Sequence, residues 1–381
     1  AASGQGISIL DRGYDTNFQK EISRTGTVQN HHIAFGGGNE NASYRASIGI
    51  QDHTTVVKTD GYRNYIAKLD LDQNAFSGIM NVNLGIFGSL TKRSYIPDSQ
   101  SLFYSAATFN PTFGTEKVGG SYEGIPSASQ IAHPLALLEK DVNEDNAHFN
   151  AHMRTVFKIA SHLNLTLMGS YSYNVVGNSH YYPTAVWSKG EAYRGEDKMQ
   201  NILGNAVLSY TNDFGKHHLE LLGLSEFQKI DMEGFGTTVS GFTTNRFGYY
   251  NLSAGAYLPW GGTSSYFENP KLLSFMGRTS YAYDGKYILT FNARGDASSK
   301  FGENHRWGFF PSVSAAWVLD KENFIRDIEW ISSLKITAGY GRSGNQDAIS
   351  SYNSLQMIEG ENPNLKDLAM PFDQFCKLNK V

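Results

Sequence analysis

Two absences narrow what this chain of 381 residues can be. It has a single cysteine, Cys376, so an internal disulfide is excluded and a metal site made of cysteines lacks a second thiol. It has no continuous run of about 20 apolar residues, the length that a membrane helix needs. Residues 1–10 also lack the basic start and apolar centre of a signal peptide. Either the chain is soluble, or an export signal was removed and any membrane contact is made by strands, whose hydropathy signal is weak.

Proline and charge are also scarce. There are 10 prolines against 39 glycines, aromatic residues make up 13% and charged residues 18%, which favours strands and turns over helices. The formal net charge is -4 and no basic run occurs, so nucleic acid is not expected as a partner. The length is ample for a large core or a barrel.

What the chain does contain is a period-two alternation of apolar and polar residues. In its clearest segment Tyr287, Leu289 and Phe291 alternate with polar or charged neighbours, directly after the hairpin signal Asp284-Gly285. A sheet of such strands has one apolar and one polar face, as the wall of a membrane barrel does. About twelve segments show the pattern: 29–35, 44–50, 65–71, 80–86, 153–159, 163–173, 202–210, 219–227, 273–283, 287–293, 313–317 and 334–340.

The connections between these segments alternate between short and long. The short ones are 36–42, 73–77, 160–162, 212–216 and 284–285. The long ones are 92–147, 174–199 and 230–271, with shorter members at 51–62 and 297–306. An antiparallel meander with tight turns at one end and wide loops at the other has the asymmetry of an outer-membrane barrel. A soluble sandwich does not need that asymmetry.

Several ordered motifs carry a resemblance to a known family. They are YDGKYILT (283–290), RGDASSKFG (294–302), RWGFFPSVSAAW (306–317) and ISSLKITAGYGRSGNQ (331–346). Nearer the start, 18–25, 29–32 and 44–47 resemble the passage from plug to first barrel strands in the same family. In these motifs the chain resembles the barrel of the SusC/RagA-type TonB-dependent outer-membrane transporters, over roughly Tyr14 to Asn364. One departure is Ala297, where the family often has Gly.

The resemblance implies an all-β fold: about twelve strands of a transmembrane barrel of about 22, with short periplasmic turns and long extracellular loops. We expect residues 1–28 to be the end of a plug or linker, 29–365 to be a partial outer-membrane barrel and 366–381 to be an atypical tail. A plug, with the energy-coupling segment at its front, precedes the barrel in the family and is missing from this sequence.

The resemblance also implies a function. The family imports glycans or oligopeptides across the outer membrane with a SusD-like lipoprotein and TonB, which acts through the plug. The expected surroundings are outer-membrane lipid on one face and a substrate path on the other, with no catalytic residue, metal or cofactor. Given the strand registers above, the expected lumen residues are Arg45, Lys68, Asp70, Asp72, Asn81, Asn83, Arg278, Asn292 and Arg294.

Aromatic residues in the long connections form a second group of candidates. Among Gly, Ser and Asn they suit stacking on sugar rings, capture of peptides or docking of a lipoprotein lid, although packing of the loops on themselves explains them equally well. The group is Phe103, Tyr104, Tyr181, Tyr182, Trp187, Trp260 and Tyr266.

A metal site, an enzyme and a soluble binding module fit the sequence less well. A metal site at His148 and His152 is disfavoured, because residues four apart on a strand are about 13 Å apart. No catalytic constellation supports an enzyme. A soluble or surface β-rich glycan-binding module is the main alternative to a transporter. In such a module the apolar faces would meet across a dry interior, whereas in a barrel they would point outward.

Overall fold

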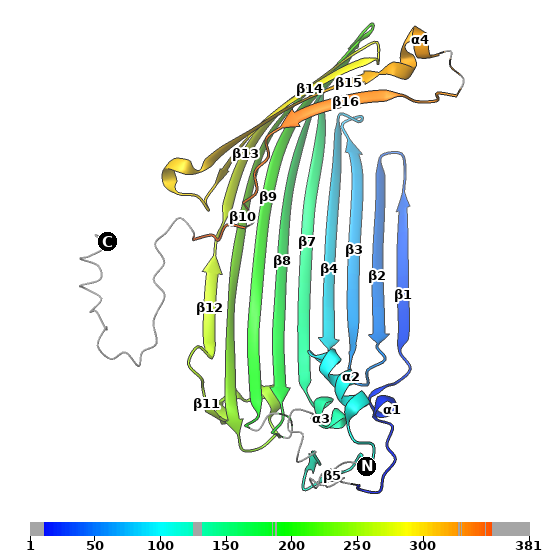
Figure 1. Cartoon of the computed structure of the whole chain (residues 1–381). Coiled ribbons are helices and arrows are strands. Elements are labelled where there is room, and N and C mark those ends of the chain that lie inside the picture. The colour runs from blue at the N-terminus through cyan, green and yellow to red at the C-terminus, as the bar shows by residue number, and fades with distance from the viewer. Residues whose placement is uncertain are drawn as a thin grey trace, which may run out of the picture.

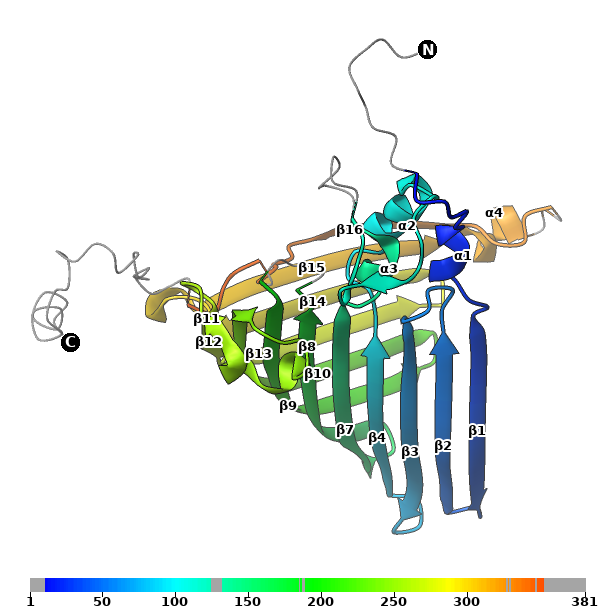
Figure 2. The same ribbon diagram turned by 90° about the horizontal axis from the view of Figure 1, so that it is seen from below.

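The computed structural model describes residues 11–124, 132–184, 186, 189–326, 328, 330–346 and 348–352. In this part of the chain a 14-stranded antiparallel sheet dominates, and twelve of its strands lie side by side in chain order. The sheet curls into a trough that is open along one side (Figures 1 and 2). The twelve are β1 (Thr27–Gly38), β2 (Ala42–Thr54), β3 (Gly61–Ala75), β4 (Met80–Ser94), β7 (Asp141–Ala160), β8 (Leu163–Tyr182), β9 (Glu191–Phe214), β10 (His217–Phe242), β13 (Lys271–Tyr283), β14 (Tyr287–Ser298), β15 (Trp307–Val318) and β16 (Lys335–Gly341).

Eleven of the twelve segments with period-two alternation lie within one of these strands and the twelfth, 334–340, overlaps β16 in all but its first residue, so the predicted all-β barrel portion is confirmed. Most strands are longer than their predicted segments, and the difference is large for four of them: β7 and β8 have 20 residues, β9 has 24 and β10 has 26. Much of the predicted loop 174–199 is therefore strand, as is the start of 230–271. Polar residues occupy both faces in these extensions, so the alternation disappears from the sequence while the backbone ladder continues.

Tight turns join the strands at one end of the trough. Asp284 (φ 53°) and Gly285 (φ 62°) both have positive φ, as the two central residues of a type I′ hairpin do. One connection at this end is not short: residues 319–334 contain η4 (Leu319–Lys321) and α4 (Asn323–Arg326). We call this end the short-turn end and the other the long-loop end.

At the long-loop end the connections carry the remaining elements. These are α2 (Ser99–Thr108), β5 (Lys117–Val118), β6 (Ser121–Tyr122), α3 (Pro134–Leu137), η1 (Gly248–Tyr250), η2 (Leu252–Ala254), β11 (Gly255–Tyr257), β12 (Thr263–Glu268) and η3 (Glu303–His305). Strands β11 and β12 pair with β10 where it continues beyond its contact with β13.

The large apolar side chains of the strands lie on one face of the sheet and are exposed. Ile48 is 62% exposed, and register pairs place its neighbours across the wall on the same face. The opposite face carries the polar alternates, including the buried Ser47 and Ser274. The apolar faces thus point outward and do not meet across a dry interior. The members of this apolar belt include Ile33, Ile48, Tyr65, Met153, Leu208, Phe227, Phe275, Leu289, Phe291, Val313 and Ile336.

The main compact hydrophobic core of the described residues lies at the long-loop end. There α1 (Phe18–Ile22) packs with α2 and α3 around Phe18, Ile22, Leu102 and Phe113 (Figure 2). The segment before β1 thus lies beside the 95–140 connection, and its assignment to a plug stays a prediction. No helix among the described residues is long and apolar enough to cross a membrane.

Candidate functional site

The predicted lumen residues all lie on the polar face of the trough. Side chains alternate between the two faces along each strand, so every second residue of a strand points to this face. Six of them lie on β2, β3 and β4. Arg45 stands directly opposite Asp70 in the register of β2 and β3. Asn81 Nδ2 donates to Asp72 Oδ1 at 3.0 Å, and Asn83 is the cross-strand partner of Asp72. Lys68 places its Nζ 5.5 Å from the centre of the Phe87 ring.

The other three predicted lumen residues lie on β13 and β14. Arg278 stands opposite Asn292, whose Nδ2 donates to Ser312 Oγ at 3.1 Å. Arg294 donates to Asp296 at 2.9 Å and to the fully buried Ser274 Oγ at 2.9 Å. It also forms an ion pair with Glu226 at 3.4 Å.

The nine residues therefore share one face of the sheet but form two clusters, separated in strand order by β7 to β10. Sequence reasoning missed Glu226 and Asp296, which complete the Arg294 cluster. Each occupies a polar position of its strand, so period two could have found both.

Between the two clusters, the polar face near the long-loop end carries a column of rings. His180 stacks on Tyr182 at 4.5 Å and on Tyr193 at 5.3 Å between centroids. Lys140 Nζ lies 5.2 Å from the centre of the Tyr182 ring, and Glu191 accepts from His180 Nε2 at 3.3 Å. Tyr182 was expected in a loop, but it is the last residue of β8. The column was missed because its members come from polar strand extensions with no visible alternation.

The remaining loop-aromatic candidates have different environments. Phe103 and Tyr104 lie on α2, and Tyr104 is 62% exposed. Trp260 lies in the β10–β13 connection and is 69% exposed. Two were wrongly expected in loops: Tyr181 is a buried residue of β8, and Tyr266 is on β12, donating to Asp197 at 2.9 Å. Trp187 lies outside the described residues.

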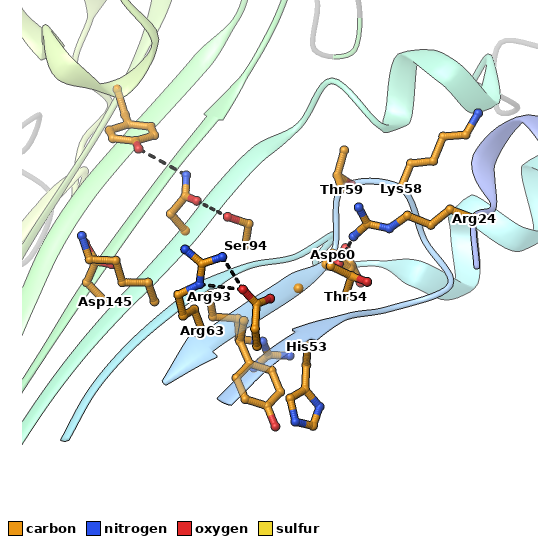
Figure 3. A pocket seen from close by; sticks show the side chains of 16 residues that line it. Arg24, His53, Thr54, Lys58, Thr59, Asp60, Arg63, Arg93, Ser94 and Asp145 are labelled. Carbon is orange, nitrogen blue, oxygen red and sulfur yellow. Dashed lines mark hydrogen bonds and ion pairs between the residues drawn. The ribbon is translucent and has the colours of Figure 1, made fainter. Parts of the chain in front are cut away.

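A polar pocket of about 390 Å³ lies at the long-loop end of β2, β3, β4 and β7 (Figure 3). Asp52 accepts from Arg63 Nε at 2.7 Å. Asn143 links Ser94 to the Tyr249 hydroxyl, through contacts of 2.6 and 3.2 Å. Asp60 accepts from the Ile96 N–H at 2.7 Å, and Arg24 donates to the Asp60 carbonyl.

The charges of this pocket are partly buried. Burial raises the pKa of the Asp60 carboxyl, against the Ile96 N–H and the nearby Arg93 and Arg24, which lower it. Burial also raises the pKa of Tyr249 to about 12, and its hydrogen bond with Tyr250 adds to this effect. No group of three or more His, Cys, Asp or Glu suited to a metal ion occurs in the described part of the chain. The site therefore offers hydrogen bonds, charges and rings for binding.

The geometry defines a class of protein: a portion of the wall of a transmembrane barrel, with a polar inner face and a structured rim at one end. No family model matches the chain. It is similar to TonB-dependent receptor P3 of Formosa agariphila, with 32% identity over 90% of this chain and 35% of that protein. TonB-dependent receptor SusC of Bacteroides thetaiotaomicron is 26% identical over 87% of the chain and 35% of that protein.

Solved structures agree on the fold. The RagAB peptide transporter superposes with a TM-score of 0.71 at 20% identity, over 89% of this chain and 39% of that chain. The chain spans about a third of the length of the curated relatives it matches. It corresponds to the barrel portion of a SusC/RagA-type TonB-dependent outer-membrane transporter.

Proposed function

We propose that the chain forms part of an outer-membrane importer of glycans or oligopeptides that depends on TonB and works with a SusD-like lipoprotein. The outward apolar belt is the single observation that carries this proposal. A soluble protein would have to leave this belt in water, whereas a bilayer buries it. The names of the relatives, which include TonB-dependent receptors and a peptide transporter, support the same conclusion.

In this proposal import is binding and passage without covalent chemistry. Substrate is caught at the long-loop rim, where exposed aromatic side chains such as Tyr104 and Trp260 offer ring faces to sugars or peptides. TonB then shifts the plug of the whole protein, and substrate passes along the polar face between the Arg45–Asp70 and Arg294 clusters. The relatives' names include both SusC and a peptide transporter, so both substrate classes are kept.

The soluble glycan-binding module is disfavoured by the same belt. If the chain were such a module, the protein would stay monomeric in buffer without detergent. The importer predicts a whole protein that fractionates with the outer membrane and needs detergent for extraction.

The test is uptake by cells that produce the whole protein to which this chain belongs. Labelled oligosaccharides and oligopeptides are supplied singly, to cells with and without a functional tonB gene. We expect uptake of one class, and its loss without TonB. A double variant Arg45→Gln/Arg294→Gln should lower uptake, while Lys216→Gln, in the β9–β10 turn, should leave it unchanged. Uptake that is indifferent to TonB would overturn the proposal.

A further inference from the structure

The pocket of Figure 3 lies where the outward face of the wall changes from apolar to charged. The strand registers place Ile50, Tyr65 and Leu90 in one row across β2, β3 and β4. The next outward row, two residues nearer the long-loop end, is Asp52, Arg63, Lys92 and, on β7, Asp145. No register shift interrupts these pairings, so the charged row lies on the same face as the apolar belt.

The height of this row matches the edge of a bilayer. From Tyr65 to Ala75, β3 climbs about 25 Å along the membrane normal, at a rise of ~3.3 Å per residue and a tilt of ~40°. This is the height of the apolar band in outer-membrane barrels. Arg63 and Lys92 therefore lie at headgroup level, in the leaflet on the long-loop side.

Positive charge is in excess around the pocket. Its lining includes five Lys or Arg side chains (Arg24, Lys58, Arg63, Lys92, Arg93) and three carboxylates (Asp52, Asp60, Asp145). Two of the carboxylates have partners, because Asp52 binds Arg63 and Asp60 accepts from the Ile96 N–H. Of the cations, Lys58 forms an ion pair with Glu21 at 3.6 Å, so the excess positive charge rests on the other four. Asp145 faces Lys92 across the register and moderates the positive charge there. Ser94 and Asn143 add hydrogen-bonding groups beside the cations.

We propose that the outward row Arg63–Lys92 and its pocket bind the phosphate headgroup of an anionic lipid in the long-loop-side leaflet. The cations and the hydrogen-bonding groups contact the phosphate, while an acyl chain lies along the apolar belt below Tyr65 and Leu90. A soluble phosphate has the same headgroup chemistry, but it cannot use the adjoining apolar surface. The inference rests on the barrel fold and the register, and it does not depend on which solute is imported.

The test measures lipid retained by the whole purified protein. The protein is placed in nanodiscs that contain equal amounts of phosphatidylglycerol and phosphatidylcholine. It is then released from them in a mass spectrometer, and the ratio of the two lipids that stay bound to the protein is measured. We expect an excess of phosphatidylglycerol that falls by about tenfold or more in Arg63→Gln/Lys92→Gln. A variant that keeps the charge, Arg63→Lys, should retain most of the excess.

The matched control is Lys216→Gln/Lys335→Gln, which removes two positive charges at the short-turn end. All variants are first checked for the folded barrel by heat-dependent migration on a gel. An equal loss in this control would overturn the inference, as would unchanged retention in Arg63→Gln/Lys92→Gln. A competition experiment distinguishes a lipid phosphate from a soluble one. If inorganic phosphate or an acidic oligosaccharide at equal concentration displaces the lipid, the pocket is a site for soluble anions and the proposed lipid site is refuted.

Discussion

Glu322 connects the one long connection of the short-turn end to the outward face. Its carboxylate accepts from the Tyr287 hydroxyl at 2.6 Å, from Trp317 Nε1 at 3.1 Å and from Lys286 Nζ at 3.1 Å. Tyr287 and Trp317 lie opposite each other on β14 and β15, at the edge of the apolar belt. One side chain thus holds the connection against two interfacial aromatic residues.

These hydrogen bonds make the contribution of Glu322 dependent on pH. They lower its pKa from 4.5 to about 2, with the Tyr287 hydroxyl as the largest cause. Because the folded-state pKa is lowered, the stabilisation is fully present above about pH 4.5 and is lost as the pH falls through about 2. We expect the unfolding temperature of the whole protein to fall less between pH 5 and pH 2 in Glu322→Gln than in the unmodified protein.

The control for this measurement is Glu40→Gln, an exposed carboxylate in the β1–β2 turn at the same end. Its pH profile should follow that of the unmodified protein. If Glu322→Gln follows the same profile as well, the three hydrogen bonds have no measurable linkage to folding.

At the scale of the element, the three helices of the long-loop end depend on a buried histidine. His133 is the N-cap of α3, accepting from the Leu135 N–H at 3.2 Å, and its ring packs against Phe18, Phe109 and Tyr122. Burial lowers the pKa of His133, against the Gly114 carbonyl, which raises it. The folded cluster therefore favours the neutral ring.

This cluster should loosen in mild acid. Because the pKa of His133 is lower in the folded state, neutral His133 stabilises the folded cluster fully above about pH 6.5. This stabilisation is lost as the pH falls through the pKa that His133 has in the folded state. We expect hydrogen exchange in α2, corrected for intrinsic rates, to lose protection between pH 7.5 and pH 5. His133→Asn keeps an N-cap acceptor and removes the titration, so this loss should shrink. His162→Asn in the β7–β8 turn is the control, and an undiminished loss in His133→Asn would contradict the assignment.

The elements also show how far the sequence could be interpreted. The alternation of apolar and polar residues located all twelve wall strands. Successive side chains of a strand point to opposite faces, so a strand with one face in lipid must alternate, as Tyr287 to Ala293 does. Above the belt both faces are wet, so the ends of β8 and β9 looked like loops and the ring column of His180 was missed. The clustering of Arg294 with Glu226 depends on register across two neighbouring strand pairs, which alternation within one strand cannot supply.

At the scale of the whole molecule, the belt should make one face of the wall intolerant of charge. Phe291 points outward near the middle of β14, and its neighbour Thr290 points to the polar face. Phe291→Lys should destabilise membrane insertion of the whole protein by about 2–4 kcal/mol, the cost of a lysine on the lipid face near the bilayer midplane. Thr290→Lys should insert normally, because its side chain meets water.

The measurement is made on isolated outer membranes. The share of each variant that is folded is determined from its heat-dependent migration on a gel. Equal yields of the two variants would mean that the two faces of β14 have the same surroundings, and the membrane assignment would then fail.

Strand length varies around the trough in a way that shapes its opening. It rises from 12 residues in β1 to 26 in β10, and falls to 13 in β13. With an apolar band of about 25 Å, the extra length of β8–β10 stands above the bilayer as continuous sheet, whereas beyond the shorter β1–β4 the rim consists of the packed helices α1–α3. In the described part of the wall the rim is therefore of two kinds, a hydrogen-bonded sheet extension at β8–β10 and a small helical core beside β1–β4.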